Sequence, residues 1–390
     1  ADFLRRNGYK YEIDYGERGR EFWNRALDIA PEELKLDDSF YRDEWERVIQ
    51  PQGITSKQDY LKASRVGRGV PLNRKARIQG WPVFEEYRTL MNEHGLKEPD
   101  DAMRDARHLI LSGETSVNYK AVVVDEAQDM GAQAFMLLRH LVSEGKNDLF
   151  IVGDAHQRIY RHRVVLGQCG IKIVGRSRKL RVNYRTTDET RKWAVDLLEG
   201  ISVDDLDGDL DDQRGYTSLL HGVEPTIRHY SSFQGEIEGI AAFLTQDKEH
   251  SWKSTCLVAR TQGFLKQYES ALKEKEIETY WVQRNQADDR KAPGLRLATM
   301  HRVKGLEFDR VIIAGVNDGT VPLAKALTES SDPSIRNESE TRERALLYVA
   351  ATRARKEVMV TCFGKPSPFM LQFLPGNHRD ERDASEPDSR

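Results

Sequence analysis

The sequence predicts an α/β protein in which parallel sheets follow a mostly helical N-terminal region. From Ala1 to about Ser116, apolar residues recur at three- and four-residue spacing, which is typical of helices. From Tyr119 onward, short apolar runs alternate with helical patterns, as in parallel sheets that helices cover on both faces. Polar residues follow several of these runs directly, where ligands bind beyond the ends of parallel strands.

The N-terminal region contains three segments with a clear helical pattern, at residues 20–30, 81–95 and 98–110. The last has acidic residues in its first turn, which favours a helix start. Residues 57–77 hold seven basic residues and one acid, Asp59. This composition has two interpretations, a solvated loop with short helices or a nucleic-acid contact surface.

The rest of the chain reads as alternating strands and helices. Strands are expected at residues 120–124, 148–152, 171–174, 179–182, 226–231, 254–260, 277–282, 295–301, 310–316 and 358–363. Helices are expected at residues 132–145, 187–200, 233–247, 261–275 and 340–358. The polar end of the chain has the composition of a disordered tail.

The composition limits the possible classes of protein. The net charge is −3, 32% of residues are charged, and no apolar run approaches the ~20 residues of a membrane span. The N-terminus lacks a signal pattern. The three cysteines are far apart and form no C-x-x-C pair, which argues against a disulfide framework or a zinc site. We therefore expect a cytoplasmic protein without a membrane partner.

Two carboxylates, Asp125 and Glu126, end the first expected strand within the pattern D-E-A-Q-D. One carboxylate at such a position can hold Mg²⁺, and its neighbour can orient or deprotonate a water molecule. Gln157 follows the next expected strand, where an amide can sense a terminal phosphate. The pair alone is weak evidence, and the extended pattern carries more information.

Residues 155–187 contain nine lysines and arginines and no acid, which indicates a polyanionic partner. Tyr160 and His162 lie among these arginines, so base stacking is one interpretation of them. A core position is the alternative for Tyr160.

Further polar residues follow later strands. Tyr184 and Arg185 come after an expected strand, where an arginine can clamp phosphate. The loop from Thr299 to Glu307 carries His301, without a second histidine or cysteine at metal-ligand spacing. Arg353 ends an apolar helix, either as an interface ion pair or as an arginine finger that reaches a phosphate.

Taken in order, these segments resemble the UvrD/Rep group of superfamily 1 DNA helicases. VVVDEAQD resembles motif II, VGDAHQRIY motif III, LRVNYR motif IV, LATMHRVKGLEFD motif V and LLYVAATRA motif VI. These five motifs stand in the family's order over about three fifths of the chain, from Tyr119 to Thr361.

The resemblance implies an ATP-driven, Mg²⁺-dependent motor that moves 3′ to 5′ on single-stranded DNA or at single-strand/double-strand junctions. It implies that Asp125 coordinates Mg²⁺ and Glu126 activates water. Gln157 would couple the γ-phosphate to DNA, Arg185 would contact the γ-phosphate, and Arg353 would be the arginine finger. Tyr184 would stack on adenine, with Gly305 and Glu307 in the nucleotide site. The residues that would line the DNA path are Tyr160, His162, Arg163, Thr299 and His301.

The family's architecture implies four parts. Residues 1–116 would form a helical accessory subdomain, and residues 117–178 an incomplete first RecA-like domain. Residues 179–364 would form the second RecA-like domain, and residues 365–390 a polar tail. The basic stretch 57–77 would then lie in the accessory subdomain.

Three features depart from the family pattern. His162 stands where the family usually has tryptophan, which predicts weaker base stacking. The short stretch between Val282 and Thr299 leaves no room for the large second accessory subdomain. The phosphate-binding pattern G-x-x-x-x-G-K-[ST] occurs nowhere in the sequence.

These departures lead to three hypotheses. The first is that the chain is the C-terminal portion of an ATP-dependent helicase and is inactive alone because the phosphate loop lies upstream. The alternative is a non-catalytic, helicase-like DNA-binding or regulatory subunit. A third possibility is a phosphate cradle supplied by a partner protein. The sequence indicates neither the pathway served nor any protein partner.

Overall fold

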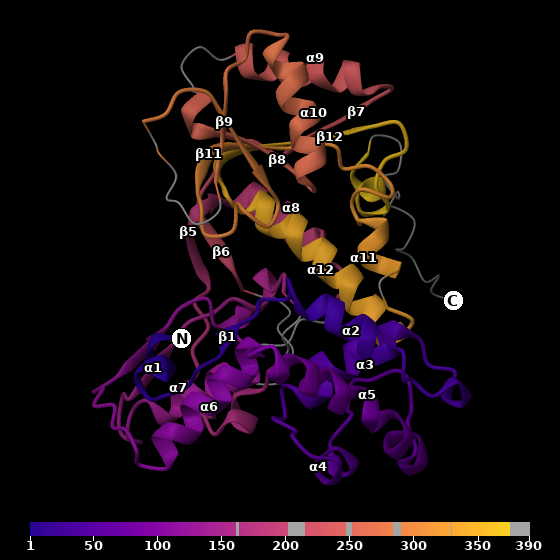
Figure 1. The fold of residues 1–390 in the computed structure, drawn as a ribbon. Helices are drawn as coiled ribbons and strands as arrows, with labels where there is room; N and C mark the ends of the chain where they lie inside the picture. Colours follow the sequence, from indigo (N-terminus) through magenta and orange to yellow (C-terminus); the bar gives the residue numbers. More distant parts are fainter. Residues whose placement is uncertain are drawn as a thin grey trace, which may run out of the picture. The chain divides into compact units, whose positions relative to one another are not determined.

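The computed structural model describes residues 1–160, 164–201, 215–246, 252–283, 289, 291–328 and 330–374 (Figure 1). They form two compact units. Unit 1 contains the described residues of 1–178 and 328–339, and unit 2 those of 179–201, 213–327 and 340–374. The predicted α/β fold with parallel sheets is confirmed, because the named strands of the described chain all pair in parallel. Within these described ranges, no helix combines the length and apolar character of a membrane span.

Unit 2 is built on a six-stranded parallel sheet. Its strand order is β7 (Thr226–Tyr230), β12 (Ala354–Phe363), β11 (Phe308–Ile313), β8 (Thr255–Ala259), β10 (Leu295–Thr299) and β9 (Thr279–Trp281). Helices α9 (Phe233–Gln246) and α10 (Gln262–Lys273) cover one face, and α8 (Asp188–Asp196) and the later part of α12 (Pro333–Ala351) lie on the other (Figure 1). Because both faces are covered, β8 is buried along its whole length.

The remaining elements of unit 2 are short. Strands β5 (Val182–Thr187) and β6 (Thr217–Leu220) form a separate parallel pair. Two 3₁₀ helices are η6 (Trp252–Ser254) and η7 (Pro368–Phe373), and the short helix α11 is Ala324–Thr328. Helix η7 buries Phe369 and Met370 within the range expected to be a polar tail.

Several expected boundaries in the second half of the chain were wrong. Residues 171–174 form no strand, although Ile171 is buried in the core of unit 1. The strand expected at residues 179–182 begins only at Val182. The helix expected to run to residue 358 ends at Ala351, and β12 begins at Ala354.

The helical part of unit 1 has an aromatic core. Its elements are α1 (Asp2–Arg6), β1 (Glu12–Ile13), α2 (Gly19–Leu27), η1 (Glu32–Leu34), α3 (Asp38–Glu44), the π-helix η2 (Trp45–Ile49), α4 (Lys57–Lys62), α5 (Arg74–Glu93), β2 (Leu96–Lys97) and α6 (Pro99–Leu111). Trp23 of α2 stacks on Tyr87 of α5 with ring centroids 4.0 Å apart. The helix starts α3, α4 and α5 are capped by the side chains of Asp37, Ser56 and Asn73.

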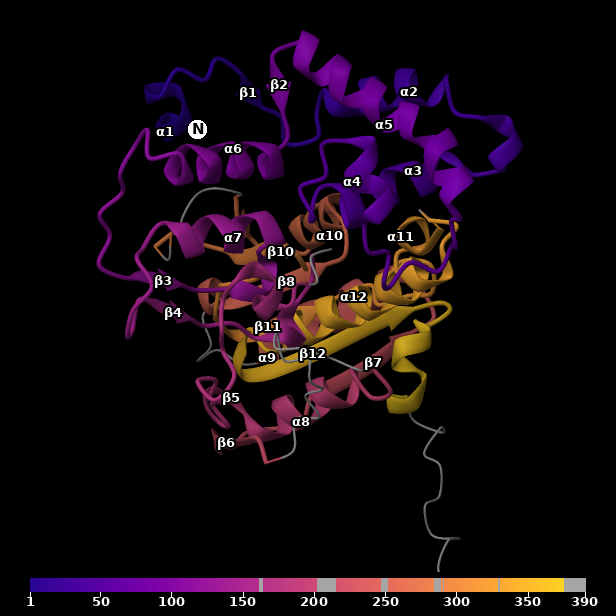
Figure 2. The ribbon, with the colours of Figure 1, turned by 90° about the horizontal axis from the view of Figure 1, so that it is seen from below.

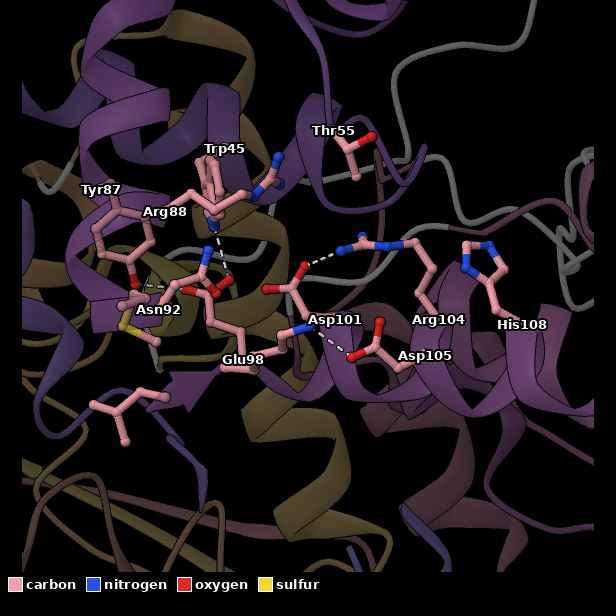
Figure 3. A pocket seen from close by; sticks show the side chains of 13 residues that line it. Trp45, Thr55, Tyr87, Arg88, Asn92, Glu98, Asp101, Arg104, Asp105 and His108 are labelled. Carbon is pink, nitrogen blue, oxygen red and sulfur yellow. Dashed lines mark hydrogen bonds and ion pairs between the residues drawn. The ribbon is translucent and has the colours of Figure 1, made fainter. Parts of the chain in front are cut away.

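A half-buried carboxylate, Glu98, joins the start of α6 to this core. Glu98 lines a hollow of about 230 Å³ and accepts hydrogen bonds from Trp45 Nε1 (2.7 Å) and the Tyr87 hydroxyl (2.8 Å) (Figure 3). Gln50 Nε2 donates a third hydrogen bond (2.5 Å). Burial raises the pKa of Glu98, although these three donors lower it. None of the motif residues lines this hollow, so we assign Glu98 to packing of the helical part.

The remainder of unit 1 is a small parallel sheet beside one helix. Strands β3 (Val122–Val124) and β4 (Leu149–Ile151) pair in parallel, and α7 (Ala132–His140) packs beside α6 (Figure 2). The connections contain the 3₁₀ helices η3 (Ala127–Asp129), η4 (Ala155–Gln157) and η5 (Leu166–Cys169). Val124 faces the core under this sheet, whereas Val123 points to the opposite face.

Glu44 is the centre of a buried ion-pair network in unit 1. Its fully buried carboxylate pairs with Arg65 (2.6 Å) and Arg68 (3.1 Å). Arg68 also pairs with Asp332 (3.0 Å). Asp332 accepts hydrogen bonds from the Gly69 N–H (3.1 Å) as well. The network therefore fixes the chain segment around residue 332 onto the helical part of unit 1.

We predict that Glu44→Ala destabilises unit 1 by about 3–5 kcal/mol, because it removes a buried carboxylate that Arg65 and Arg68 share and leaves Arg68 only its pair with Asp332. Urea unfolding followed by hydrogen–deuterium exchange of α3 and α5 measures this loss. Glu12→Ala is the control, since Glu12 and Arg18 form an exposed pair that contributes at most about 1 kcal/mol. Equal losses in the two variants would contradict the role of the network.

Candidate functional site

The parallel pairing of β3 and β4 brings the two expected phosphate-site segments of unit 1 to one edge. Val124 is in register with Ile151, so the strands end side by side. Asp125 and Glu126 follow β3 directly, and Asp154 and Gln157 lie just beyond β4. The carboxyl ends of parallel strands are where such sheets bind ligands.

Glu126 has an unusual backbone conformation for a residue other than glycine. Its φ and ψ are 53° and 39°, in the left-handed region. This conformation costs on the order of 1–3 kcal/mol and persists only where surrounding contacts fix it. Two such contacts are the Glu126 N–H bond to Asp125 Oδ1 (2.8 Å) and the Ala127 N–H bond to the Val152 carbonyl (3.0 Å).

Four residues form a continuous hydrogen-bonded series across this edge, through their side chains and the backbone N–H of Asp154, which we name the Gln128 bridge. Gln128 Nε2 donates to Glu126 Oε2 (2.6 Å), and Gln128 Oε1 accepts from the Asp154 N–H (2.9 Å). Gln157 Nε2 then donates to Asp154 Oδ2 (2.8 Å). The bridge therefore connects Glu126 with Gln157 through Gln128 and Asp154.

Asp154 is held in its charged form by these contacts. Burial raises the pKa of its carboxyl, but His156 and Gln157 lower it by more, so the pKa lies below its usual range. The His156 N–H also donates to Asp154 Oδ1 (3.0 Å), which fixes the start of η4. A charged Asp154 can keep its hydrogen bond from Gln157 at neutral pH.

Asp125 has the properties of a Mg²⁺ ligand that acts together with phosphate oxygens. It is exposed at the end of β3, and one of its oxygens accepts the Glu126 N–H. The described residues contain no group of three or more candidate metal ligands. Mg²⁺ in phosphate sites is commonly held by one or two carboxylates together with substrate phosphates and water, and Asp125 fits that mode.

In unit 2, the structure brings two of the expected nucleotide-site residues into direct contact. Arg185 Nε pairs with Glu307 Oε1 (2.7 Å), and both side chains are partly exposed. Tyr184 lies next to Arg185 on β5, and its side chain is 73% exposed, as an aromatic surface for stacking requires. Gly305 has a φ of +79° in the turn before Glu307, a backbone conformation that favours glycine.

Arg353 lies in the turn between α12 and β12 and is 2% exposed. Its Nε donates to the Val349 carbonyl (3.1 Å), and its Nη2 donates to Thr352 Oγ1 (3.3 Å). The guanidinium is thus bonded within unit 2.

Two sequence models of known families match the chain in these same regions. The UvrD/REP helicase N-terminal domain matches residues 39–165, and the UvrD-like helicase C-terminal domain matches residues 283–365. The chain belongs to the UvrD/Rep-like helicases. The resemblance stated from the sequence motifs is thereby confirmed.

Individual UvrD/Rep-like relatives match short parts of the chain. ATP-dependent DNA helicase UvrD2 of Mycobacterium tuberculosis is 39% identical over 110 residues, which are 25% of this chain and 15% of the relative. ATP-dependent DNA helicase Rep of Buchnera aphidicola is 45% identical over 67 residues, 17% of this chain and 9% of the relative. The putative ATP-dependent DNA helicase YjcD of Bacillus subtilis is 38% identical over 83 residues, 21% of this chain and 10% of the relative.

A solved structure, the C-terminal domain of a possible DNA helicase from Lactobacillus, overlaps 50% of this chain and 95% of its own. The identity is 20% and the TM-score is 0.36. The three curated relatives are matched over 15%, 9% and 10% of their lengths, so the chain spans a small fraction of each.

The residues expected along the DNA path of this UvrD/Rep-like chain are only partly described. Tyr160 is 44% exposed beyond η4. His162 and Arg163 lie outside the described residues. Thr299 ends β10, and its carbonyl accepts the N–H groups of Arg302 and Val303 (2.8 and 3.1 Å).

His301 follows Thr299 and packs near a bidentate ion pair. Arg260 bonds both oxygens of Glu343, at 2.9 and 2.6 Å. Burial lowers the pKa of His301 to about 4, and the charge of Arg260 lowers it as well, whereas Glu343 raises it. His301 is therefore uncharged at neutral pH, and any DNA contact that it makes there is made by a neutral ring.

The basic stretch 57–77 divides into structural and exposed residues. Arg65 and Arg68 pair with the buried Glu44. Arg77 donates to the carbonyls of Tyr60 and Ala63 (3.1 and 3.0 Å). The exposed basic residues are Lys57, Lys62, Arg74 and Lys75. Three of the seven basic residues thus make contacts within unit 1, and the four exposed ones leave open both the solvated loop and the nucleic-acid contact surface.

Sequence reasoning missed Gln128 and Asp154 as members of the site. In the sequence, Gln128 is part of the D-E-A-Q-D pattern and Asp154 is part of VGDAHQRIY, and neither pattern marks them as site residues. The useful signal is that each lies within three residues of an expected site residue at the end of a strand. Their contact with each other depends on the pairing of β3 with β4, which sequence spacing does not give.

We predict that His301→Gln makes unit 2 less sensitive to acid. The unfolded chain binds a proton on His301 near pH 6.5, whereas the folded chain binds it only near pH 4. The stability from neutral His301 is thus present above pH 6.5 and is lost as the pH falls toward 4. The unfolding free energy of wild type minus that of the variant should fall over this window by at most about 3 kcal/mol.

The matched control for this prediction is His108→Gln, because His108 is exposed. It controls for the loss of an imidazole in general, so a change that is specific to His301 must exceed the change that it shows. Chemical unfolding at pH 7 and pH 4.5 gives both differences. A flat difference for His301→Gln would show that the neutral state of His301 does not contribute to folding.

Proposed function

We propose that this chain is the C-terminal portion of an ATP-dependent DNA helicase that moves 3′ to 5′ on single-stranded DNA. The observation that carries the proposal is the common edge of β3 and β4. It gathers Asp125, Glu126 and Gln157, the residue types that phosphoryl transfer to water needs. Membership of the UvrD/Rep-like family favours ATP hydrolysis as the reaction. Asp125, Glu126 and Gln157 are the candidate groups for its steps.

The roles of the residues follow from their chemistry. Asp125 holds Mg²⁺, which neutralises charge on the phosphates of ATP when it is bound. Glu126 orients and deprotonates the attacking water. Gln157 couples the presence of the terminal phosphate to the position of the loop that carries Tyr160. In unit 2, Arg185 and Arg353 supply positive charge for phosphate oxygens, and Tyr184 stacks on the base.

The exposed face of the small sheet supports the proposal that a further segment completes unit 1. Val123 and Phe150 are 73% and 64% exposed on neighbouring strands, whereas Val122, Val124, Leu149 and Ile151 pack on the other face. Parallel sheets are normally covered on both faces, and two strands alone are marginally stable. We propose that an upstream segment with the phosphate-binding loop adds strands and covers this face.

DNA is the proposed polyanion. The exposed basic residues of unit 1 between positions 164 and 178 are Lys172, Arg176 and Arg178. Their charge suits a phosphate backbone, for which binding weakens steeply as salt rises. The exposed Tyr160 adds a ring on which a base can stack.

We predict that the 390-residue chain hydrolyses no ATP, with or without single-stranded DNA. The reading frame extended upstream to include a G-K-[ST] loop should turn over ATP in a DNA-stimulated manner, in the usual range of about 1–10³ s⁻¹. In that longer protein, Glu126→Gln should lower kcat by about 10²–10⁴, because the group that activates water is lost.

Glu144→Gln is the control for charge removal, since Glu144 is exposed and precedes β4, whereas the site residues follow the strands. It should leave kcat unchanged. A stop codon directly upstream of Ala1, together with salt-dependent DNA binding and no hydrolysis, would support the non-catalytic DNA-binding subunit instead. ATP hydrolysis by the 390-residue chain at the rate of the longer protein would refute both the inactive C-terminal portion and the non-catalytic subunit.

A further inference from the structure

A single buried glutamine links the loop after β3 to the loop after β4. Gln128 is 2% exposed, and both ends of its amide are used. Its Nε2 donates to Glu126 Oε2 (2.6 Å), and its Oε1 accepts from the Asp154 N–H (2.9 Å). It is therefore the one residue of the Gln128 bridge that contacts both the Glu126 side chain and the loop after β4.

The amide is the chemical group that this position requires. Glu126 presents an acceptor and the Asp154 N–H presents a donor, so the residue between them must donate at one end and accept at the other. A glutamate at position 128 has nearly the same shape but only accepts when ionised. It would keep the bond from Asp154 and replace the bond to Glu126 by repulsion between two carboxylates.

The bond from Gln128 also orients a residue whose backbone is constrained. Glu126 lies in the left-handed region, and its N–H is bonded to Asp125. With the backbone fixed in this way, the hydrogen bond from Gln128 holds one oxygen of the Glu126 carboxylate toward the loop after β4. The left-handed conformation and the bridge together hold one orientation of Glu126.

We propose that Gln128 is a positioning residue that ties the orientation of the Glu126 carboxylate to the position of the loop that carries Gln157. A displacement of Gln157 moves Asp154, and the Asp154 N–H transmits the displacement to Gln128 and so to Glu126. The position of the loop that carries Gln157 thereby determines whether the Glu126 carboxylate faces the attacking water. This inference rests on the proposed function, because it takes Glu126 as the group that activates water.

The bridge itself is tested in the 390-residue chain by hydrogen exchange at single amides. Gln128→Leu removes the acceptor for the Asp154 N–H, so this amide should exchange about tenfold faster or more. Gln128→Glu keeps the acceptor, so the Asp154 amide should stay within about threefold of wild type. Equal exchange in Gln128→Leu and wild type would overturn the bridge.

Gln133 provides a matched control for loss of a buried amide. It is 1% exposed on α7, five positions along the chain, and it donates to the carbonyls of Gln50 and Pro51 (3.3 and 2.9 Å). Gln133→Leu removes buried hydrogen bonds of unit 1 without touching the bridge. If it accelerates exchange of the Asp154 amide as much as Gln128→Leu does, the effect is general loosening and the bridge is not supported.

The positioning role is tested by steady-state kinetics in the upstream-extended protein. Gln128→Glu should lower kcat for ATP hydrolysis by about 10²-fold, since it misdirects the general base. KM for ATP should change by less than about threefold, because Gln128 is assigned no contact with the nucleotide. Gln133→Glu should leave both constants near wild type.

The possible outcomes separate the two proposals. If Gln128→Glu keeps the wild-type kcat, the positioning role is overturned while the proposed helicase function stands. A parallel fall of kcat and rise of KM in the Gln128 and Gln133 variants would also overturn it, because both changes would then reflect lost packing. If the longer protein with intact Gln128 hydrolyses no ATP, the proposed function fails, and the exchange experiment still decides whether the bridge exists.

Discussion

The parallel pairing of β3 with β4 is the interaction on which the rest of the site depends. The register Val124 with Ile151 ends both strands at one edge, so Glu126 and Asp154 come within reach of one glutamine side chain. The same pairing leaves Val123 and Phe150 on an exposed face. One constraint thus both assembles the Gln128 bridge and leaves one face of this sheet exposed in the described part of the chain.

The two units differ in how completely their sheets are covered. The six-stranded sheet of unit 2 has helices on both faces and a buried central strand, β8. The two-stranded sheet of unit 1 has one buried face, and the aromatic core of that unit lies in its helical part. Because burial of apolar surface is the main source of stability, we expect the β3–β4 layer to open more readily than the sheet of unit 2.

The sequence alone was sufficient to predict the elements that depend on residues close together in the chain. Apolar runs located the strands of the six-stranded sheet and of the β3–β4 pair, and their ends placed Asp125, Glu126 and Gln157 at one edge of the β3–β4 pair. It was insufficient where long-range contacts decide the outcome. The apolar run 171–174 packs as irregular chain instead of pairing as a strand. Arg65 and Arg68 read as surface charge, yet their partner is Glu44, about twenty positions away along the chain.

We propose that an upstream segment, which brings the phosphate loop, completes the β3–β4 layer. The most direct test is hydrogen exchange of the backbone amides of β3 and β4 in the 390-residue chain and in the upstream-extended protein. We expect fast exchange in the shorter chain and strong protection in the longer one, with β8 protected equally in both. Equal protection of β3 and β4 in the two proteins would contradict the proposal that an upstream segment completes this layer.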